Sequence, residues 1–401
     1  MKYIIYILIS VIISVFNNSC DKNENTIPPP QILSEQLDST KQIPILAWLG
    51  VPTEETNVTR FEELKNAGFT MNLSWYGSLA STLKALEIAE ETDIKLIVSC
   101  PELATKTEET VNLLKGYSAL AGYFLKDEPS KIFFSYVGEW GERILKYDNE
   151  HFVYANLYPT YASANELGTP DYNDYVNEFI ETIPVEFISF DHYPILEGRN
   201  IRKDYYKNLE IISKAAKQAG KPFWAFALAW EHQSYRAPNL NELRFQVYSN
   251  LAYGAQGIQY FTYWRGLISD TTKERTPTYE IVKSMNSEIK ALSAVFVGGE
   301  VIGGVYHTGS SIPDGTEKLS GLPNGVKKLE TNGSAGAIVS QIKNGEYTYL
   351  VIVNRDIFND MQVTIEFENK VKRIFKDTYI NTVPLNSNVT VKPGDILIYR
   401  I

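Results

Sequence analysis

Acidic side chains stand at the ends of three short apolar runs of this sequence, and two of the three sites have aromatic and imidazole neighbours. The acidic residues are Asp127 and Glu128, Asp191 next to His192, and Glu231 next to His232. One protonated and one ionised carboxyl group can hand a proton to a leaving oxygen and stabilise the positive charge that develops. Aromatic walls accept the apolar face of a sugar ring. The pattern indicates acid–base chemistry on a carbohydrate.

These residues need a scaffold that brings several strand ends together. From residue 43 onward, short apolar or β-branched runs alternate with longer amphipathic stretches. We expect strands at 45–49, 69–75, 95–100, 120–125, 152–157, 186–190, 222–229 and 257–263. Eight strand–helix units in about 250 residues favour a (β/α)8 barrel, and no glycine-rich phosphate loop follows any strand.

Catalytic residues of such a barrel stand at the carboxyl ends of its strands. The residues at these positions therefore give the candidate site. We expect Glu128 and Glu231 to be catalytic. We expect substrate binding by Trp48, Trp75, Asp127, Asn156, Tyr158, Asp191, His192, Tyr193, His232 and Trp264.

This set of residues resembles clan A glycoside hydrolases, in which one glutamate follows strand four and another follows strand seven. Segments 241–246 and 252–264 look like the strand-seven-to-eight region of β-galactosidase-type members. By that resemblance Glu128 would be the acid/base, Glu231 the nucleophile, and Trp264 the floor of the subsite beside the cleaved bond. A retaining mechanism would place the two carboxyl groups about 5 to 5.5 Å apart.

The residue before Glu128 supports an alternative. Clan A enzymes usually carry asparagine there, whereas this chain carries Asp127, and Asp127-Glu128-Pro129 is similar to glycoside hydrolase family 123. That resemblance implies a substrate-assisted N-acetylhexosaminidase, in which the substrate's acetamido oxygen is the nucleophile and the aspartate orients it. Glu231 would then only bind substrate.

Other interpretations of the same residues remain open at this point. Asp127-Glu128-Pro129 could simply start a helix, with Asp127 as its N-cap. Glu242 could replace Glu231 as the second carboxylate, or could pair with Arg236 or Arg244. The barrel could also be a surface lipoprotein that binds glycans without cleaving them, because a fold does not guarantee an activity.

Composition limits the partners and cofactors. With 38 basic and 48 acidic residues the net charge is −10, and no basic stripe suits nucleic acid. Four histidines without a His-x-His after the first strand argue against a metal site, so we expect no metal, no cofactor and a monomer. Cys100, at the end of a strand, is expected to be inert packing.

The two ends of the chain have different characters. Residues 1–19 have the charge and apolar run of a signal peptide, and Cys20 follows as in bacterial lipoproteins. We therefore expect lipidation of Cys20, a tether over 20–41, and attachment to the cell envelope, at the outer membrane. Residues 42–292 form the barrel. Residues 293–401, with Asn-Gly turns between alternating runs, predict an antiparallel β-sandwich.

Overall fold

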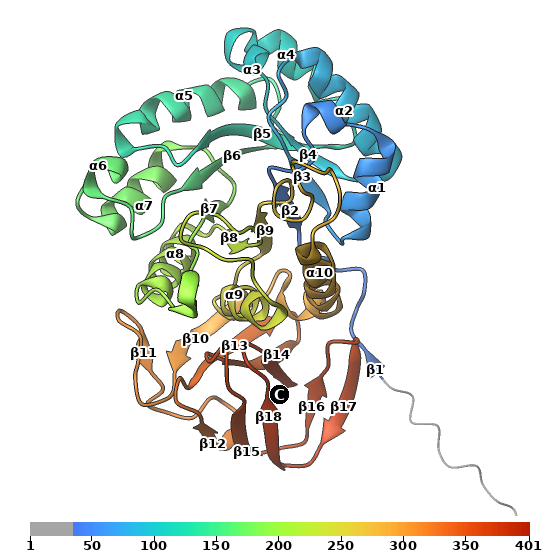
Figure 1. The fold of residues 1–401 in the computed structure, drawn as a ribbon. Coiled ribbons are helices and arrows are strands. Elements are labelled where there is room, and N and C mark those ends of the chain that lie inside the picture. The colour runs from blue at the N-terminus through green and yellow to red at the C-terminus, as the bar shows by residue number, and fades with distance from the viewer. Residues whose placement is uncertain (1–34) are drawn as a thin grey trace, which may run out of the picture. The chain divides into compact units, whose positions relative to one another are not determined.

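The computed structural model describes residues 35–401 (Figure 1). The signal peptide, Cys20 and most of the expected tether lie outside the described residues. Within residues 35–401, no helix combines the length and the apolar character needed to cross a membrane. The described chain contains a closed barrel of parallel strands followed by two antiparallel sheets.

The barrel has all eight strands that the sequence predicts, in chain order. They are β2 (Ile45–Trp48), β3 (Met71–Leu73), β4 (Lys95–Val98), β5 (Leu120–Asp127), β6 (Phe152–Leu157), β7 (Ile188–Phe190), β8 (Phe223–Leu228) and β9 (Gly257–Phe261). Strand β9 pairs with β2 in parallel and closes the ring. The predicted fold class, a (β/α)8 barrel followed by a β-sandwich, is confirmed.

Helices cover the outside of the barrel (Figure 1). They are α1 (Val58–Asn66), α2 (Leu79–Thr92), α3 (Pro101–Thr105), α4 (Thr107–Leu114), α5 (Phe134–Leu145), α6 (Ala164–Leu167), α7 (Tyr172–Thr182), α8 (Tyr205–Ala219), α9 (Leu240–Ala252) and α10 (Pro277–Phe296). Helix α1 illustrates why they form. The Asn57 side chain caps its first turn by accepting from the Arg60 N–H, and Phe61 and Leu64 point into the core.

The interior of the barrel is filled with large aromatic side chains. Trp48 meets Phe124 and Phe226 edge to face, with ring centroids 5.7 and 5.3 Å apart. Farther along the barrel, Phe187 stacks on Trp224 at 4.1 Å. These rings fill much of the barrel, and the buried side chains of Tyr154, Ser189 and Gln259 are hydrogen-bonded to one another among its strands.

The C-terminal part forms two sheets that are antiparallel except for the parallel pair β10–β11. The larger sheet has the order β1-β17-β16-β19-β14-β13-β10-β11 and the smaller has β12-β15-β18. The strands of this C-terminal part, in chain order, are β10 (Glu300–His307), β11 (Glu317–Lys318), β12 (Val326–Asn332), β13 (Ala337–Asn344), β14 (Tyr347–Asn354), β15 (Met361–Phe367), β16 (Val371–Ile374), β17 (Tyr379–Val383), β18 (Asn386–Val391) and β19 (Ile396–Arg400). A separate apolar cluster, including Val339, Leu350 and Val363, fills the space between the sheets.

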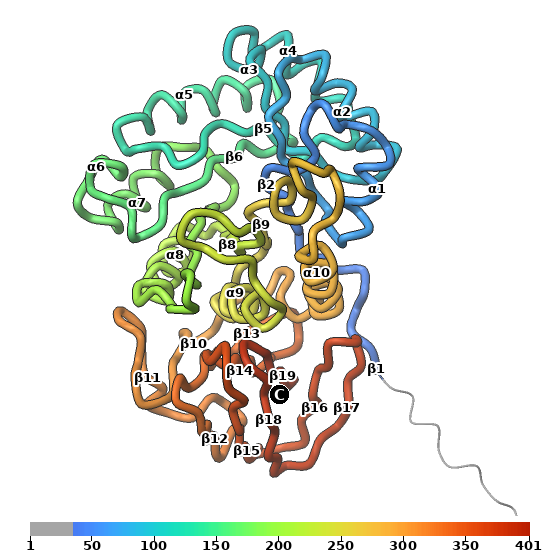
Figure 2. The backbone as a smooth tube through the Cα atoms, in the orientation of Figure 1, coloured from blue at the N-terminus to red at the C-terminus, as the bar shows by residue number. Residues whose placement is uncertain are grey.

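The domain boundaries differ from the expected ones at two places. Strand β1 (Glu35–Gln36) pairs with β17 at the edge of the large sheet, so the expected tether cannot extend to residue 41 (Figure 2). Helix α10 continues to Phe296 instead of ending at 292. Barrel and sandwich are in contact: the Asn344 amide donates to the carbonyls of Ala294 and Val297, at 3.1 and 2.9 Å.

Candidate active site

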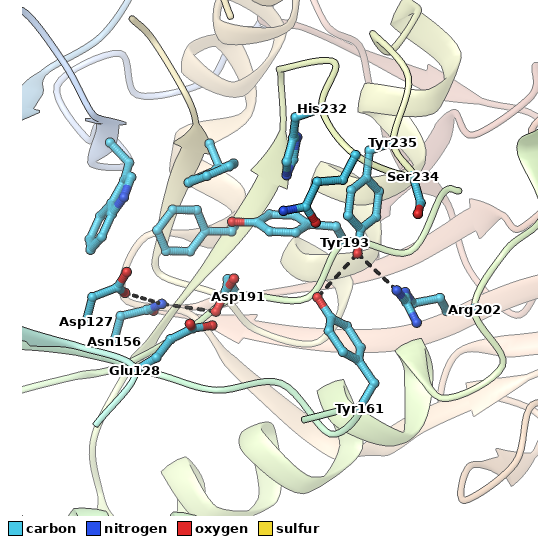
Figure 3. A pocket seen from close by; sticks show the side chains of 14 residues that line it. Asp127, Glu128, Asn156, Tyr161, Asp191, Tyr193, Arg202, His232, Ser234 and Tyr235 are labelled. Atoms are coloured by element: carbon cyan, nitrogen blue, oxygen red, sulfur yellow. Dashed lines mark hydrogen bonds between the residues drawn. The ribbon is translucent and has the colours of Figure 1, made fainter. Parts of the chain in front are cut away.

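A cavity of about 370 Å³ opens at the carboxyl ends of the barrel strands (Figure 3). Its volume is in the range of small-molecule sites. It is lined by Trp48, Asp127, Glu128, Asn156, Tyr161, Asp191, Tyr193, Arg202, Phe226, His232, Gln233, Ser234, Tyr235 and Phe261. Carboxylates, aromatic rings and one guanidinium therefore face the same space.

The backbone turns sharply at Glu128. Strand β5 runs through Asp127, and Glu128 adopts a left-handed conformation with φ 45°. Its N–H donates to the Asn156 carbonyl at 2.8 Å, which ties this turn to the neighbouring strand. Non-glycine residues in this region are strained and cluster at functional sites. The alternative that Asp127 caps a helix is wrong, because the next α-helix begins only at Phe134.

Glu128 and Asp191 line the same cavity, so the charge of each acts on the other. Burial, together with the charges of Asp191 and Asp127, raises the pKa of Glu128 to about 10. Burial and the charge of Asp127 also raise the pKa of Asp191, to about 7. Of the two, Glu128 is therefore the carboxyl group that holds a proton at neutral pH.

The Asn156 side chain links two of the three carboxyl groups. Its Nδ2 lies 3.3 Å from Asp127 Oδ1 and 3.1 Å from Asp191 Oδ1, and donates to both. Its Oδ1 accepts from the Ser189 hydroxyl at 2.7 Å, so the amide can only point its NH2 toward the acids. Burial raises the pKa of Asp127 to about 6, although the bond from Asn156 opposes this. Asp127 is thus ionised above that pH.

Aromatic rings form the other walls of the cavity. Tyr193 packs against Phe261 at 5.4 Å and against Tyr235 at 5.8 Å, and the Tyr161 and Tyr235 hydroxyls lie 3.5 Å apart. His232 stacks on Trp230 at 4.6 Å. These faces can receive the apolar side of a sugar, while the acids and Asn156 offer partners for hydroxyl or amide groups.

The structure brings several of the expected site residues into one cavity. Those that line it are Trp48, Asp127, Glu128, Asn156, Asp191, Tyr193 and His232. Five others do not line it: Trp75, Tyr158, His192, Glu231 and Trp264.

The residues that do not line the cavity make their contacts elsewhere in the structure. Trp75 is 42% exposed and touches the site only through the edge of Trp48. His192 is buried with Nε2 3.5 Å from Asp204, and burial lowers its pKa. Trp264 donates through Nε1 to Asp270 at 2.9 Å, away from the subsite that the resemblance assigned to it. Tyr158 is half-buried beside Tyr175.

Glu231 is exposed, and its neighbour His232 lines the cavity instead. His232 and Tyr235 form an antiparallel bridge that folds the loop after β8 back on itself. His232, Gln233, Ser234 and Tyr235 of this folded loop line the cavity, whereas Glu231, just before it, does not. The structure therefore does not bring Glu231 to Glu128.

Glu242, the alternative second carboxylate, is buried and stabilises the start of a helix. It is 1% exposed, forms a capping box with Asn239 at the start of α9, and pairs with Arg236 at 2.7 Å and Arg199 at 3.1 Å. The expected pairing with Arg236 is confirmed, whereas Arg244 pairs with Glu288. Cys100 is buried, and burial raises the pKa of its thiol, as inert packing requires.

Sequence reasoning missed half of the lining residues. Phe226 could have been found from the alternation of β8. Phe261 is the last residue of β9 and was likewise within reach of a strand reading. The others, Tyr161, Arg202, Gln233, Ser234 and Tyr235, were missed because loop direction decides whether a loop side chain enters a cavity. Across residues 35–401, no cluster of three or more histidine, cysteine or acidic side chains is arranged to hold a metal ion.

Comparisons with known proteins give only distant similarities. No protein-family model matches the chain, and no curated protein matches it. An arabinofuranosidase structure has a TM-score of 0.47 at 11% identity, over 92% of this chain and 98% of that one. A glycoside hydrolase family 30 subfamily 8 xylanase from Clostridium acetobutylicum has 0.45 at 10%, over 92% and 97%.

A hyperthermophilic endo-β-1,4-glucanase has a TM-score of 0.44 at 12% identity, over 61% of this chain and 97% of that chain. Similarities this remote carry no argument about what the chain does. The chemistry has to be argued from the side chains of the cavity.

Proposed function

We propose that this protein is a glycoside hydrolase in which Glu128 is the general acid/base. The observation that carries the proposal is the position of Glu128 at the carboxyl end of the barrel, inside an aromatic-walled cavity where burial and neighbouring acids raise its pKa. A general acid must be protonated at working pH and must reach the leaving oxygen. Glu128 lines the cavity and meets both conditions.

We further propose the substrate-assisted mechanism. A retaining pair needs carboxyl groups about 5 to 5.5 Å apart. Glu231, the expected partner of Glu128, is exposed and does not line the cavity. Asp127 is ionised above about pH 6 and lies on the same wall, where it can accept a hydrogen bond from a substrate acetamido N–H.

The proposed hydrolysis proceeds in two steps. Glu128 donates its proton to the glycosidic oxygen as the bond from C1 to that oxygen breaks, and the acetamido oxygen forms a bond to C1. Asp127 holds the acetamido N–H and stabilises the cyclic oxazolinium. A water molecule then attacks C1, the bond to the acetamido oxygen breaks, and Glu128 takes a proton from the water. The product keeps the configuration of the substrate.

The test is turnover of matched aryl glycosides with and without an N-acetyl group. We expect Glu128→Gln to abolish turnover. Asp127→Asn should reduce cleavage of the N-acetylated substrate by two orders of magnitude or more, whereas Glu231→Gln should leave it unchanged. If Glu231→Gln abolishes turnover and Asp127→Asn does not, the retaining pair of Glu128 and Glu231 is correct. Glycan binding by a wild-type protein without any turnover would instead indicate a binding protein.

We also propose that the protein is lipid-anchored through Cys20 at the bacterial outer membrane. The support is the sequence: a basic start, an apolar run without charge, and a cysteine before a polar stretch. Intact-mass measurement of the membrane-extracted protein should show an acylated Cys20 N-terminus and no residues 1–19. Cys20→Ala should release the protein from the membrane fraction, and an unmodified Met1 N-terminus would refute the proposal.

A further inference from the structure

Arg202 stands across the cavity from the three carboxyl groups (Figure 3). Its guanidinium carbon lies 4.0 Å from the centroid of the Tyr161 ring, and one NH2 group donates to the Tyr235 hydroxyl at 3.1 Å. These two contacts fix the guanidinium in place but do not neutralise it. A fixed, charged group on the wall of a cavity is a specific contact point for a ligand.

No acid of the described chain is paired with Arg202. Among residues 35–401 it takes part in no ion pair within 4.0 Å, and its Nε is buried without a hydrogen-bond partner. Asp204, close by in sequence, is already engaged with His192 at 3.5 Å and with the Thr160 hydroxyl at 2.7 Å. A buried donor of a charged group is costly when it has no partner. An anionic ligand would supply that partner.

A second cavity, of about 390 Å³, adjoins the first and has Arg202 as a common wall. It also contains Lys203 and Arg355, with Asp314 as its single acid. Arg355 is 6% exposed; it donates to the carbonyls of Thr308 and Ser311, and its Nε is also buried without a partner.

The lining of the second cavity is mainly positively charged, whereas the whole protein is negatively charged. The chain carries a net charge of −10, yet three cations and one exposed acid line the second cavity. Lys203 and Arg355, like Arg202, form no ion pair within 4.0 Å among the described residues. Clefts lined by one sign of charge attract ligands of the opposite sign. The cationic side chains thus gather in the second cavity, and Arg202 is the residue that this cavity shares with the first.

We infer that the substrate is an acidic glycan, with a carboxylate or sulfate group held by Arg202 where the two cavities meet. The inference rests on the proposed glycosidase function and names its substrate class. The guanidinium edge can offer Nε and an NH2 group to two oxygens of the same anion, the arrangement in which arginine binds carboxylates and sulfates best. The rest of the glycan extends toward Lys203 and Arg355.

The catalytic acids do not oppose this arrangement. Glu128 is protonated at neutral pH, and the pKa of Asp191 is raised to about 7, so the acidic side of the cavity carries less negative charge than its three carboxyl groups suggest. An anionic substituent near Arg202 thus meets weak repulsion and one direct attraction.

Binding of matched monosaccharides tests the inference directly. The probes are glucuronate and galacturonate, glucose 6-sulfate and galactose 6-sulfate, and neutral glucose and galactose, each titrated calorimetrically into the full mature protein. We expect at least one acidic probe to bind about tenfold or more tightly than its neutral counterpart. A preference among the uronates identifies a carboxylate, and one among the sulfated sugars identifies a sulfate ester. Equal binding of all acidic and neutral probes overturns the inference.

Variants of Arg202 separate charge recognition from a purely structural role. Arg202→Gln keeps a donor for Tyr235 but removes the charge, and should abolish the preference for the acidic probe. Arg202→Lys keeps the charge and should retain part of it. Arg265→Gln is the matched control, because Arg265 also follows a barrel strand but does not line the cavity. A preference that survives Arg202→Gln overturns the inference.

Failure of this inference can be told apart from failure of the proposed function. Cleavage of neutral glycosides without any preference for acidic probes would uphold the hydrolase and reject Arg202 as an anion site. A preference for acidic probes that depends on Arg202, in a protein that cleaves nothing, would uphold the anion site and reject the hydrolase.

Discussion

Replacing Glu128 by glutamine is expected to stabilise the fold while it abolishes activity. The folded protein holds a proton on Glu128 that the unfolded chain releases, because burial and neighbouring acids raise the pKa from 4.5 to about 10. Holding a proton at a pH above the unfolded value costs about 1.4 kcal/mol per pH unit. Glutamine has the shape of a protonated glutamate, and its NH2 group can donate to Asp191 in the same way, without this cost.

The sign of the pH dependence follows from the raised pKa. Between pH 4.5 and the folded pKa, the folded state binds more protons than the unfolded state, so the stability of the wild type falls as the pH rises. At pH 7 the full cost is about 3 kcal/mol, and since Glu128 is only partly buried we expect a gain of about 1 to 3 kcal/mol in Glu128→Gln. At pH 4.5 the gain should vanish.

Urea unfolding of the wild type and the variant at pH 4.5, 6, 7 and 8 measures this difference. Barrel and sandwich share one apolar cluster that includes Ile258 and Val351, so we expect them to unfold together. Glu231→Gln is the control, because Glu231 is exposed and should not change the unfolding midpoint at any pH. A variant whose stability matches or falls below the wild type at pH 8 would refute the raised pKa of Glu128.

Three further substitutions test other parts of the structure. Gly122→Ala should destabilise the protein by several kcal/mol in thermal unfolding, because a Cβ there would lie 2.5 Å from the Phe152 ring and carbonyl; a wild-type Tm would contradict the close approach. Glu242→Ala removes a capping box and the partner of Arg236, and should cost about 2 kcal/mol without changing KM. Asn156→Ala should lower kcat at least tenfold while the circular dichroism spectrum stays unchanged, since Asn156 aligns two of the acids; unaltered kcat would reject that role.

Local sequence pattern was sufficient for the barrel itself. Each strand is a short apolar run between amphipathic stretches, and this signal needs no knowledge of distant residues. The same pattern placed Asp127 and Glu128 at the end of β5, where the barrel geometry collects side chains from neighbouring strands. The same rule placed Asn156 near the end of β6 and Asp191 directly after β7. The acidic core of the site was therefore determined by the sequence.

Residues on loops were decided by tertiary structure. Glu231 and His232 are adjacent in sequence, but the loop that the His232–Tyr235 bridge folds back brings His232 to the cavity and leaves Glu231 exposed. Arg202 reaches the site from the loop before α8, a direction set by its contacts with Tyr161 and Tyr235. Strand β1 joins a sheet whose other strands follow residue 300. Such contacts join residues distant in sequence, so no local period or spacing records them.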